Sequence, residues 1–373
     1  MPFTHPMLFD LLLLFTILYV VQITIFAVGS HNAHYAHDRS RQWNVSIIVA
    51  ARNEEEVIRP CLDSLAQLTY PQEKLEIIIV NDRSTDRTAG IIQEYVDRFP
   101  TFRLLNAVED AAAVIKGKTN AVAQAIDVSS GEILLFTDAD CVVPKQWVEE
   151  TVKYYNDDSV GVVAGYTSLR SKTLFEAIQA LDWFVLFSIA SATIRLHFPV
   201  TAVGNNLSVR RKAYDAVGGY RKIPFSITED YALFHAVTSV GKYKARFPLD
   251  DGTLVQSLPC EDWKSLYRQK KRWLTGGADM DFKSISLFAV GFAFKLLLML
   301  NFFAFGFLAV VLPFALKCLS DFLLVRPALR TFRKQHLLLY LLPFEVYYIA
   351  YVLLFPPIVL LNRKVHWKDR KFA

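Results

Sequence analysis

The sequence contains few cysteines and little excess charge, and both shortages narrow what the protein can be. Its 373 residues include four cysteines, which lie far apart and form no C-x-x-C pair: Cys61, Cys141, Cys260 and Cys318. This pattern argues against a disulfide framework and against a zinc site, and it fits a reducing compartment. The formal net charge of +5 is too small to indicate binding to nucleic acid.

Hydrophobic residues are abundant instead, and they make up 53% of the chain. The excess lies at the two ends, on either side of a middle part of ordinary composition. From Leu8 to Val28 the chain is apolar apart from Asp10 and Gln22, and about 20 such residues can span a bilayer. A cleaved signal peptide is the alternative, but no basic segment precedes the run and no convincing small-x-small cleavage site occurs. We therefore expect a retained transmembrane anchor in residues 1–30.

Three histidines at three-residue spacing, His31, His34 and His37, follow the anchor. They could bind a metal ion from one side of a helix. No cysteine partner accompanies them, so we interpret this segment as a juxtamembrane linker.

From Trp43 onward the pattern becomes an alternation of strands and helices. Apolar strands are predicted at residues 45–51, 75–80, 102–106 and 133–136, with helices between them that run to about residues 68, 99 and 128. Short apolar strands that alternate with helices build a parallel sheet with right-handed crossovers. The predicted fold class is therefore α/β, Rossmann-like, with a mostly parallel sheet.

A further apolar stretch, residues 174–194, is long enough to cross a membrane but contains Glu176, Gln179 and Asp182. A spanning helix would place the residues before and after it on opposite sides of the membrane. The candidate site residues described below come from both parts. We therefore expect an interfacial helix, either buried or amphipathic on the membrane surface.

The C-terminal third is again apolar, and residues 285–361 are expected to form transmembrane or interfacial helices. The run 285–319 contains one charge, Lys295, and is long enough for a tilted span or a tight hairpin, while the run 337–361 contains Glu345. Basic residues lie between the runs and in the tail, residues 362–373: Arg326, Arg330, Arg333, Lys334, Arg363, Lys364, Lys368, Arg370 and Lys371. Two simple spans would put these groups on opposite sides, against the positive-inside tendency, so the topology stays open at this point.

Four clusters of polar residues follow apolar runs in the middle part: Asn53-Glu54-Glu55, Asn81-Asp82, Asp138-Ala139-Asp140 and Thr228-Glu229-Asp230. The first three would lie at the carboxyl ends of parallel strands, where open α/β sheets bind their ligands. Two carboxylates one residue apart can hold a hard divalent cation, although Asp-Ala-Asp alone is equally compatible with a polar turn. The fourth cluster opens a helix, where Asp230 could be a site residue or simply the N-cap.

Three more features are compatible with a diphosphate and a sugar. Lys118 is expected near a helix start, where it could bind phosphate, and Gly204-Asn205-Asn206 is a tight polar turn that lets a ligand approach the backbone. Gln269 and Arg272 share a face of a predicted helix next to Trp273. A guanidinium and an indole can hold a diphosphate and stack on a sugar ring; a basic helix face lying on lipid is the alternative.

Taken together these motifs resemble the membrane-bound family 2 glycosyltransferases with a GT-A fold. The ordered series is VSIIVAARNEE, VNDRSTDRT, GKTNA, FTDADC, GNN, TED and QKKRW. It covers roughly residues 43–275 and includes a complete Q-x-x-R-W. The group contains synthases of cellulose, hyaluronan and poly-N-acetylglucosamine as well as ceramide glucosyltransferases. The resemblance implies a GT-A catalytic domain at residues 43–280, flanked by transmembrane helices.

The resemblance also implies a role for each matching residue. Glu54 and Asp82 would contact uridine, and Lys118 would help to bind the nucleotide; Asn81 stands where many relatives have an Asp. Asp138 and Asp140 would bind UDP and a Mg²⁺ or Mn²⁺ ion, and Asp230 would be the catalytic base. Gln269, Arg272 and Trp273 would bind the diphosphate and frame the acceptor, on whose side Gly204, Asn205, Asn206 and Glu229 are also expected.

The expected function is that of an inverting hexosyltransferase embedded in the cell's inner or plasma membrane, with its catalytic domain in the cytosol. It would move a sugar from a UDP-sugar to a hydroxyl of a lipid-like acceptor. The small membrane part favours this reading, whereas the complete Q-x-x-R-W favours the alternative, a processive polysaccharide synthase that makes a β-linked polymer. A non-catalytic membrane scaffold is a third, minor alternative.

Overall fold

The computed structural model describes residues 5–109, 115–277, 282–361, 365–367 and 370–372 of the chain. The chain forms two compact units. The sheet unit contains Ala33–Arg170 and Ile194–Leu258, and the helical unit contains Met1–Asn32, Ser171–Thr193 and Pro259–Ala373. The predicted domain boundary at residue 280 and the basic residues Arg363, Lys364 and Lys368 of the tail lie outside the described residues.

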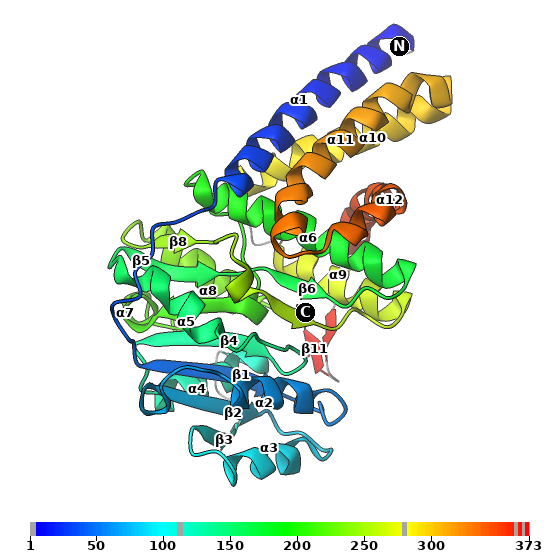
Figure 1. Cartoon of the computed structure of the whole chain (residues 1–373). Helices are drawn as coiled ribbons and strands as arrows, with labels where there is room; N and C mark the ends of the chain where they lie inside the picture. The colour runs from blue at the N-terminus through cyan, green and yellow to red at the C-terminus, as the bar shows by residue number, and fades with distance from the viewer. Residues whose placement is uncertain (1–4, 110–114, 278–281, 362–364, 368–369, 373) are drawn as a thin grey trace. The chain divides into compact units, whose positions relative to one another are not determined.

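In the part of the sheet unit that the structure describes, seven strands are hydrogen-bonded into one sheet (Figure 1). In spatial order they are β3 (Phe102–Asn106), β2 (Leu75–Asn81), β1 (Val45–Ala51), β4 (Ile133–Asp138), β7 (Leu207–Arg210), β5 (Val160–Ala164) and β8 (Lys244–Arg246). The first four are mutually parallel. β7 runs antiparallel to both of its neighbours, and β5 and β8 are parallel.

The register of the sheet aligns the carboxyl ends of the central strands β1, β2 and β4. β1 is paired on both sides, with Ala51 opposite Asn81 of β2 and Ala50 opposite Asp138 of β4. The chain leaves β1 toward β2 on one side, while β4 lies on the other. The sheet order therefore reverses between β1 and β4, and the carboxyl ends of strands at such a point are where open α/β sheets bind ligands.

Helices connect the strands and cover the sheet. They are α2 (Ile58–Ala66), α3 (Thr88–Val96), α4 (Lys118–Val128), α5 (Trp147–Val152), α7 (Arg211–Ala216) and α8 (Glu229–Ser239), with short 3-10 turns η1 (Gln72–Lys74), η2 (Lys153–Asn156), η3 (Gly204–Asn206) and η4 (Asp251–Thr253). A separate parallel pair consists of β6 (Thr167–Leu169) and β9 (Val255–Ser257). The predicted strands at 45–51 and 102–106 and the helix ending at Val128 are confirmed.

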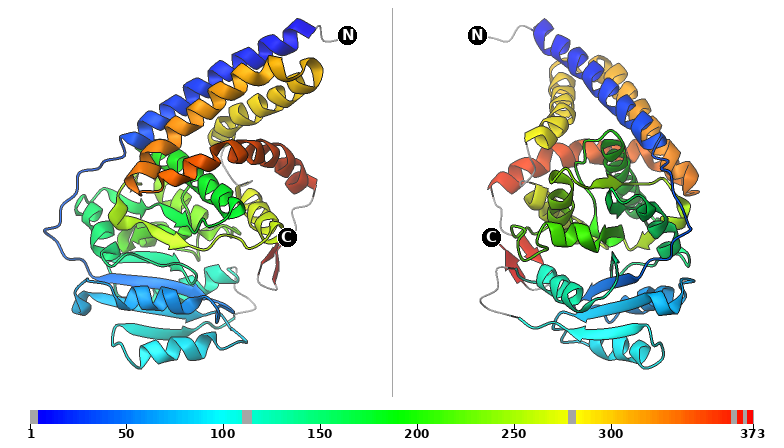
Figure 2. Two further views of the ribbon diagram at one scale, coloured as in Figure 1. Left: turned by 45° about the vertical axis from the view of Figure 1, so that its right-hand side comes forward. Right: turned by 90° about the vertical axis from the view of Figure 1, so that its left-hand side faces the viewer.

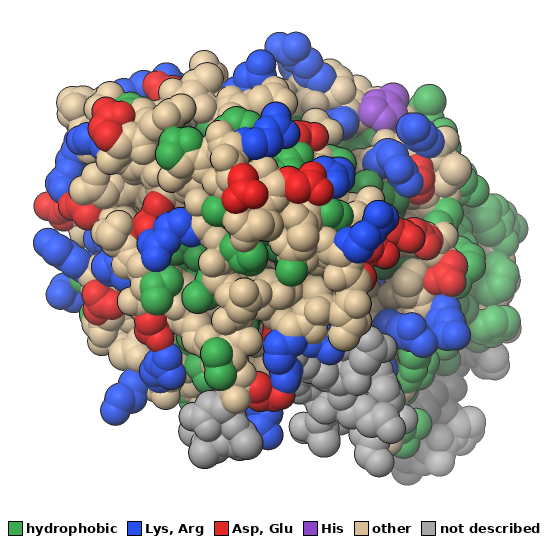
Figure 3. Space-filling view, turned by 90° about the horizontal axis from the view of Figure 1, so that it is seen from below, with side chains coloured by type: hydrophobic (Ala, Val, Ile, Leu, Met, Phe, Trp, Pro, Cys, Tyr) green, Lys and Arg blue, Asp and Glu red, His purple; other side chains and the backbone are tan. Residues whose placement is uncertain are grey.

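The core of the sheet unit consists of the apolar strand residues and the helix faces packed on them. Ile47, Val49, Ile79 and Leu135 are fully buried in one cluster. Near-continuous apolar strands are typical of a sheet covered on both faces. On the outer face over α3 and β3, acidic and basic side chains alternate with isolated apolar ones, as expected for a surface in water (Figure 3).

Among its described residues, the helical unit contains five helices that are long and apolar enough to cross a membrane. They are α1 (His5–His31), α6 (Leu174–Arg195, whose last two residues belong to the sheet unit), α10 (Phe282–Phe305), α11 (Phe307–Thr331) and α12 (Leu341–Leu361). The unit also holds α9 (Trp263–Gly277), η5 (Gln335–Tyr340) and a small hairpin of β10 (Val365–Trp367) and β11 (Arg370–Phe372).

Two of the alternatives left open by the sequence are decided by these helices. The run 285–319 is a helical hairpin, because Gly306 breaks it with a φ of 79° between α10 and α11. α6 is a buried helix: 94% of its apolar window lies inside the protein, against 28% for α1 and 22% for α10.

Polar contacts join α1 to the hairpin, and the three helices lie side by side (Figure 2). Gln22 donates to Leu287 O at 2.9 Å, and Asn301 donates to Leu8 O at 3.1 Å. The Tyr19 hydroxyl donates to Asp321 at 2.7 Å, and Lys317 is ion-paired with Asp321 at 2.8 Å and with Glu345 of α12. Buried charges must be paired in this way to be tolerated.

Candidate active site

The loops after β1 and β2 are held together at the carboxyl edge of the sheet. Asn53 and Arg83 both adopt left-handed backbone conformations, with φ of 51° and 57°. The Asn53 side chain accepts a hydrogen bond from Thr85 N at 2.8 Å, and Glu54 N donates to Thr88 Oγ1 at 2.8 Å. Such conformations outside glycine persist only where the surroundings fix them, and they gather at functional sites.

Asp82 lies in this edge and is only 5% exposed. Its backbone N–H donates to Ala51 O at 2.8 Å, and its carboxylate is 3.7 Å from Arg83 Nε. The preceding Asn81 uses its amide to donate to Asn106 Oδ1 and to accept from Ser84 N. The asparagine at this position therefore fixes the turn between β2 and α3, and Asp82 is the acid nearest to it in the chain.

Asp138 is the last residue of β4, and Asp140 follows it in a tight turn. One ligand atom each from Asp138, Asp140 and Cys141 lies within 4.8 Å of the other two. Burial, and next the charge of Asp138, raise the pKa of Asp140. Two carboxylates this close repel each other unless a cation lies between them.

The donor set of this group suits a hard divalent cation. Burial raises the pKa of the Cys141 thiol well above its usual value, so it is protonated, and it donates to Asp140 Oδ1 at 3.5 Å. Ser257 Oγ donates to the other oxygen of Asp140 at 3.3 Å. The remaining ligands are carboxylate oxygens, which Mg²⁺ and Mn²⁺ prefer to sulfur.

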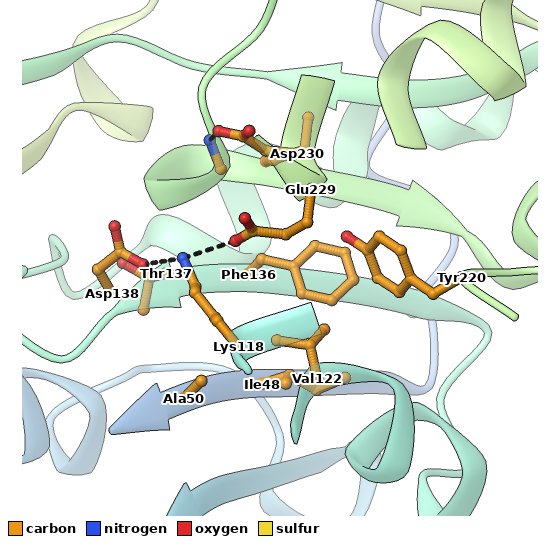
Figure 4. Close-up of a pocket in the computed structure, with 12 residues that line it drawn as sticks. Ile48, Ala50, Lys118, Val122, Phe136, Thr137, Asp138, Tyr220, Glu229 and Asp230 are labelled. Atoms are coloured by element: carbon orange, nitrogen blue, oxygen red, sulfur yellow. Dashed lines mark hydrogen bonds and ion pairs between the residues drawn. The ribbon is translucent and has the colours of Figure 1, made fainter. Parts of the chain in front are cut away.

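Lys118, the first residue of α4, joins two acids. Its ammonium is 2.7 Å from Asp138 Oδ1 and 2.9 Å from Glu229 Oε1 (Figure 4). Burial alone would lower the pKa of Lys118, but these two carboxylates outweigh it and hold the pKa well above its usual value. The side chain is therefore a cation in this pocket, suited to a phosphate group.

Asp230 is in the first turn of α8, as is Glu229. Its Oδ2 accepts a hydrogen bond from Gly204 N at 2.6 Å, and its Oδ1 accepts from Tyr231 N at 2.8 Å. Burial, and next the charge of Glu229, raise the pKa of Asp230 to about 6. A carboxylate with a pKa so near neutrality can take up and release a proton under ordinary conditions.

The turn Gly204–Asn206 is fixed by its two asparagines. Asn206 donates to Tyr166 O and Thr253 O at 2.8 Å and accepts from Trp147 Nε1 at 3.0 Å. Asn205 Oδ1 accepts from Thr167 Oγ1 at 3.1 Å. Both side chains are buried, so in this structure they support the turn, while Gly204 lies at the pocket.

One pocket brings several of the predicted residues together: Lys118, Asp138, Gly204, Glu229 and Asp230 line it (Figure 4). Glu54, Asp82 and Asp140 lie on the loops at the same edge of the sheet but do not line it. The sequence reasoning missed Tyr220, a buried residue of the lining. The turn signal Gly218-Gly219, with φ of 75° and 62°, is what precedes it.

Gln269, Arg272 and Trp273 are on α9, which belongs to the helical unit. Gln269 and Arg272 are one turn apart, as predicted. The Trp273 ring centroid is 5.6 Å from that of Trp183 on α6. Gln269 Oε1 is buried and has no hydrogen-bond partner among the described residues.

Two family models match the chain. The model for glycosyl transferase family 2 matches residues 46–218, and the model for glycosyl transferase family group 2 matches residues 133–361.

Curated relatives match the same region. A probable glycosyltransferase of Bacillus subtilis, YdaM, is 29% identical over 65% of this chain and 57% of its own length. The β-monoglucosyldiacylglycerol synthase of Synechocystis is 27% identical over 62% and 47%. The poly-β-1,6-N-acetyl-D-glucosamine synthase of Staphylococcus epidermidis is 28% identical over 63% and 55%. The chain thus spans about half the length of these relatives.

A solved structure shares the fold of nearly the whole chain. The mannosyltransferase PcManGT from Pyrobaculum calidifontis, in complex with GDP-Man and Mn²⁺, gives a TM-score of 0.61 at 18% identity. The match covers 91% of this chain and 99% of that one. The GT-A fold predicted from the sequence is therefore confirmed.

Proposed function

Because the chain belongs to glycosyl transferase family 2, we propose that it moves a sugar from a UDP-sugar to a hydroxyl group of a membrane-associated, lipid-like acceptor. The observation that carries this proposal is the pocket in which Asp138 of Asp-Ala-Asp, Lys118 and Asp230 meet. It combines groups for a diphosphate with a base of suitable pKa. The synthase of a glucosylated diacylglycerol among the relatives supports the acceptor class.

The donor would be held at the carboxyl edge of the sheet. Glu54 and Asp82 would contact the uridine, and Lys118 would bind the nucleotide through its phosphates. Asp138 and Asp140 would hold Mg²⁺ or Mn²⁺, which when bound neutralises the diphosphate and stabilises the UDP that leaves. Without cations the carboxylates of this pocket would repel a diphosphate, so Lys118 is needed there.

Asp230 would be the catalytic base. The acceptor hydroxyl gives its proton to this carboxylate while its oxygen forms a bond to the anomeric carbon. The bond from that carbon to UDP breaks on the opposite face, so the configuration inverts. Gly204 N donates to Asp230 Oδ2 and orients the carboxylate, and the other oxygen is also hydrogen-bonded, to Tyr231 N.

The Q-x-x-R-W residues would complete the reaction. Arg272 would stabilise the negative charge that develops on the leaving UDP, and Gln269 would bind the same diphosphate. Trp273 would frame the acceptor. Glu229, Asn205 and Asn206 would act on the acceptor side by holding Lys118 and the Gly204 turn.

Product analysis tests this function. The purified full-length protein would be given radiolabelled UDP-glucose, UDP-galactose or UDP-N-acetylglucosamine with a total lipid extract and Mn²⁺. We expect a single chloroform-soluble product from one donor and none from Asp230→Asn. A ladder of polymer would exclude single transfer to a lipid.

Such a ladder would support the second candidate, a processive polysaccharide synthase. The complete motif from Gln269 to Trp273 favours it, as does the polymer synthase among the relatives. Absence of transfer from any donor would leave the non-catalytic scaffold.

The protein would act as an integral protein of the inner or plasma membrane, with the catalytic residues in the cytosol, where nucleotide sugars are made. The five apolar helices support the membrane location. The basic residues between α11 and α12 support the orientation, because such residues are enriched on the cytoplasmic side.

A further inference from the structure

A buried ion pair joins two helices of the helical unit. The carboxylate of Asp182 on α6 contacts the ammonium of Lys270 on α9, and the two residues are 5% and 2% exposed. Asp182 is one of the polar residues that interrupt the apolar stretch 174–194. Lys270 occupies a variable position of the Q-x-x-R-W motif. Neither charge has a part in the reaction described above.

The Lys270 ammonium also lies against the indole ring of Trp273, the tryptophan of the Q-x-x-R-W motif. Lys270 Nζ is 4.4 Å from the ring centroid of Trp273 and 5.0 Å from that of Tyr351 on α12. Trp273 also contacts Trp183, with ring centroids 5.6 Å apart. The indole is therefore held by a cation on its own helix and by an aromatic ring that follows Asp182 in α6.

A third contact from α6 fixes the start of α9. Gln179 donates to Cys260 O at 3.1 Å and accepts from Cys260 N at 2.8 Å, three residues before the helix begins. Gln179, Asp182 and Trp183 stand at i, i+3 and i+4 and so share one face of α6. This face fixes both the start of α9 and the side chain near its end.

We propose that Asp182 and Lys270 are positioning residues for sugar transfer, which act by fixing the orientation of Trp273. This inference rests on the proposed function, in which Trp273 frames the acceptor. A buried ion pair adds little net stability compared with apolar residues of the same size. The attraction between a cation and an indole, however, depends on where the cation lies over the ring. A cation fixed by a buried carboxylate can therefore orient the ring, which apolar packing alone would not do.

The orientation of Trp273 can be measured without any acceptor. Two indoles this close couple excitonically and give a couplet in the circular dichroism spectrum. The chain has six tryptophans, so the couplet is obtained as the difference between the full-length wild type and Trp273→Phe. We expect Lys270→Met and Asp182→Asn to lose most of the couplet. Lys270→Arg, which can still pair with Asp182, should keep it.

Kinetics provide the second readout, with total lipid extract in mixed micelles as acceptor and the UDP-sugar of highest turnover as donor. Lys270→Met and Asp182→Asn should raise the apparent KM for lipid about tenfold, because Trp273 without a fixed orientation frames the acceptor less well. The KM for the UDP-sugar should not change. Lys264→Met, an exposed lysine on the same helix, is the matched control.

The outcomes separate the two proposals. A couplet of wild-type size in both Lys270→Met and Asp182→Asn would overturn the positioning role, whatever the kinetics. So would unchanged lipid KM in a wild type that transfers sugar. A wild type that transfers from no donor would overturn the proposed function, while the couplet would still decide whether the pair orients Trp273.

Discussion

The surroundings of Asp230 suit a base that works near neutral pH. Its pKa is raised to about 6, first by burial and then by Glu229. As base it must be ionised, so kcat/KM should rise with pH and level off above about 6. Asp230→Asn should lower kcat roughly 10²- to 10⁴-fold, while the new side-chain oxygen can still accept from Gly204 N. A pH–rate profile of both forms measures this.

Ionisation of Asp230 should raise the activity but lower the stability of the fold. A carboxyl pKa raised above its ordinary 3.8 means that folding disfavours the ionised form, so this group destabilises the fold as pH rises from about 4 past 6. Asp230→Asn removes the titrating group, so its Tm should fall less than that of the wild type as pH rises from about 4 past 6. Asp215→Asn, an exposed acid on α7, is the control; an equal fall of Tm with pH in the wild type and in Asp230→Asn would contradict this account.

The paired carboxylates of Asp138 and Asp140 predict a metal requirement. Because their ligand atoms lie within 4.8 Å and burial raises the pKa of Asp140, a bound divalent cation would stabilise both ions. Activity should be lost in chelator and return with Mn²⁺ or Mg²⁺. Asp140→Asn should raise the half-saturating Mn²⁺ concentration about tenfold or more. Full activity in chelator would remove both residues from a metal role.

At the scale of elements, the approach of η3 to the start of α8 sets the position of the base. A Cβ on Gly204 would come within 2.8 Å of Asp230 Cβ and 3.1 Å of its Oδ2. Gly204→Ala should therefore displace the carboxylate and lower kcat roughly 10²-fold, with a loss of about 1–3 kcal/mol in the free energy of unfolding. Urea unfolding and initial rates measure the two effects.

Gly90 in α3 provides the matched control, because nothing lies within 4 Å of a Cβ added there. Gly90→Ala should leave the rate unchanged and stabilise the helix by about 0.5–1 kcal/mol. Equal losses of activity in both variants would mean that the close approach at Gly204 has no special role.

The elements that the sequence predicted well are those whose signal is local. Continuous apolar runs that end in Asn81-Asp82 or Asp138 marked β2 and β4, because a parallel strand buried on both faces must be apolar throughout. The antiparallel β7 is four residues long and carries no such signal. Tyr220 reaches the pocket through long-range packing, which no local pattern encodes.

The two interpretations of α6 also show that a local sequence pattern does not decide how a helix is packed. Hydropathy alone marked it as a span, and its three polar residues favoured the buried or interfacial alternative. Burial decides between them, since two of those three residues are enclosed by protein: Gln179 and Asp182 are 2% and 5% exposed. The sequence placed the predicted site residues on loops and helix starts. It did not predict the ion-pair partners of Lys118 and Lys270, which are distant in the sequence.

At the scale of the whole molecule, we propose that the apolar helix α12, although long enough to span a membrane, does not cross it. It lies along α9, with Tyr347 6.2 Å from Trp263 and Phe355 5.6 Å from Tyr267, measured between ring centroids. α9 exposes Lys264 and Arg268, which the hydrocarbon layer would not accept. Both views in Figure 2 show α12 running across α1, α10 and α11 rather than beside them.

A membrane crossed by α1, α10 and α11 but not by α12 resolves the conflict of charges. The end of α11, with Arg326 and Arg330, and the linker after it, with Arg333 and Lys334, then lie on the same side as the basic tail. That side is also where the sheet unit begins, because Ala33 follows directly after α1. All basic segments and the catalytic residues would share the cytosol, as the positive-inside tendency requires, and the turn at Gly306 would face outward.

Cysteine labelling tests this arrangement in a parent whose four native cysteines are replaced by alanine and which still transfers sugar. In spheroplasts, a membrane-impermeant maleimide should label Phe307→Cys, which follows the turn and is 62% exposed in the native protein. Gln335→Cys and a cysteine appended after Ala373 should be labelled only after permeabilisation. Labelling of the appended cysteine in intact spheroplasts would mean that α12 crosses the membrane. Protection of Phe307→Cys would mean that the hairpin does not, because the turn at Gly306 is the only part of α10 and α11 that this arrangement exposes outside.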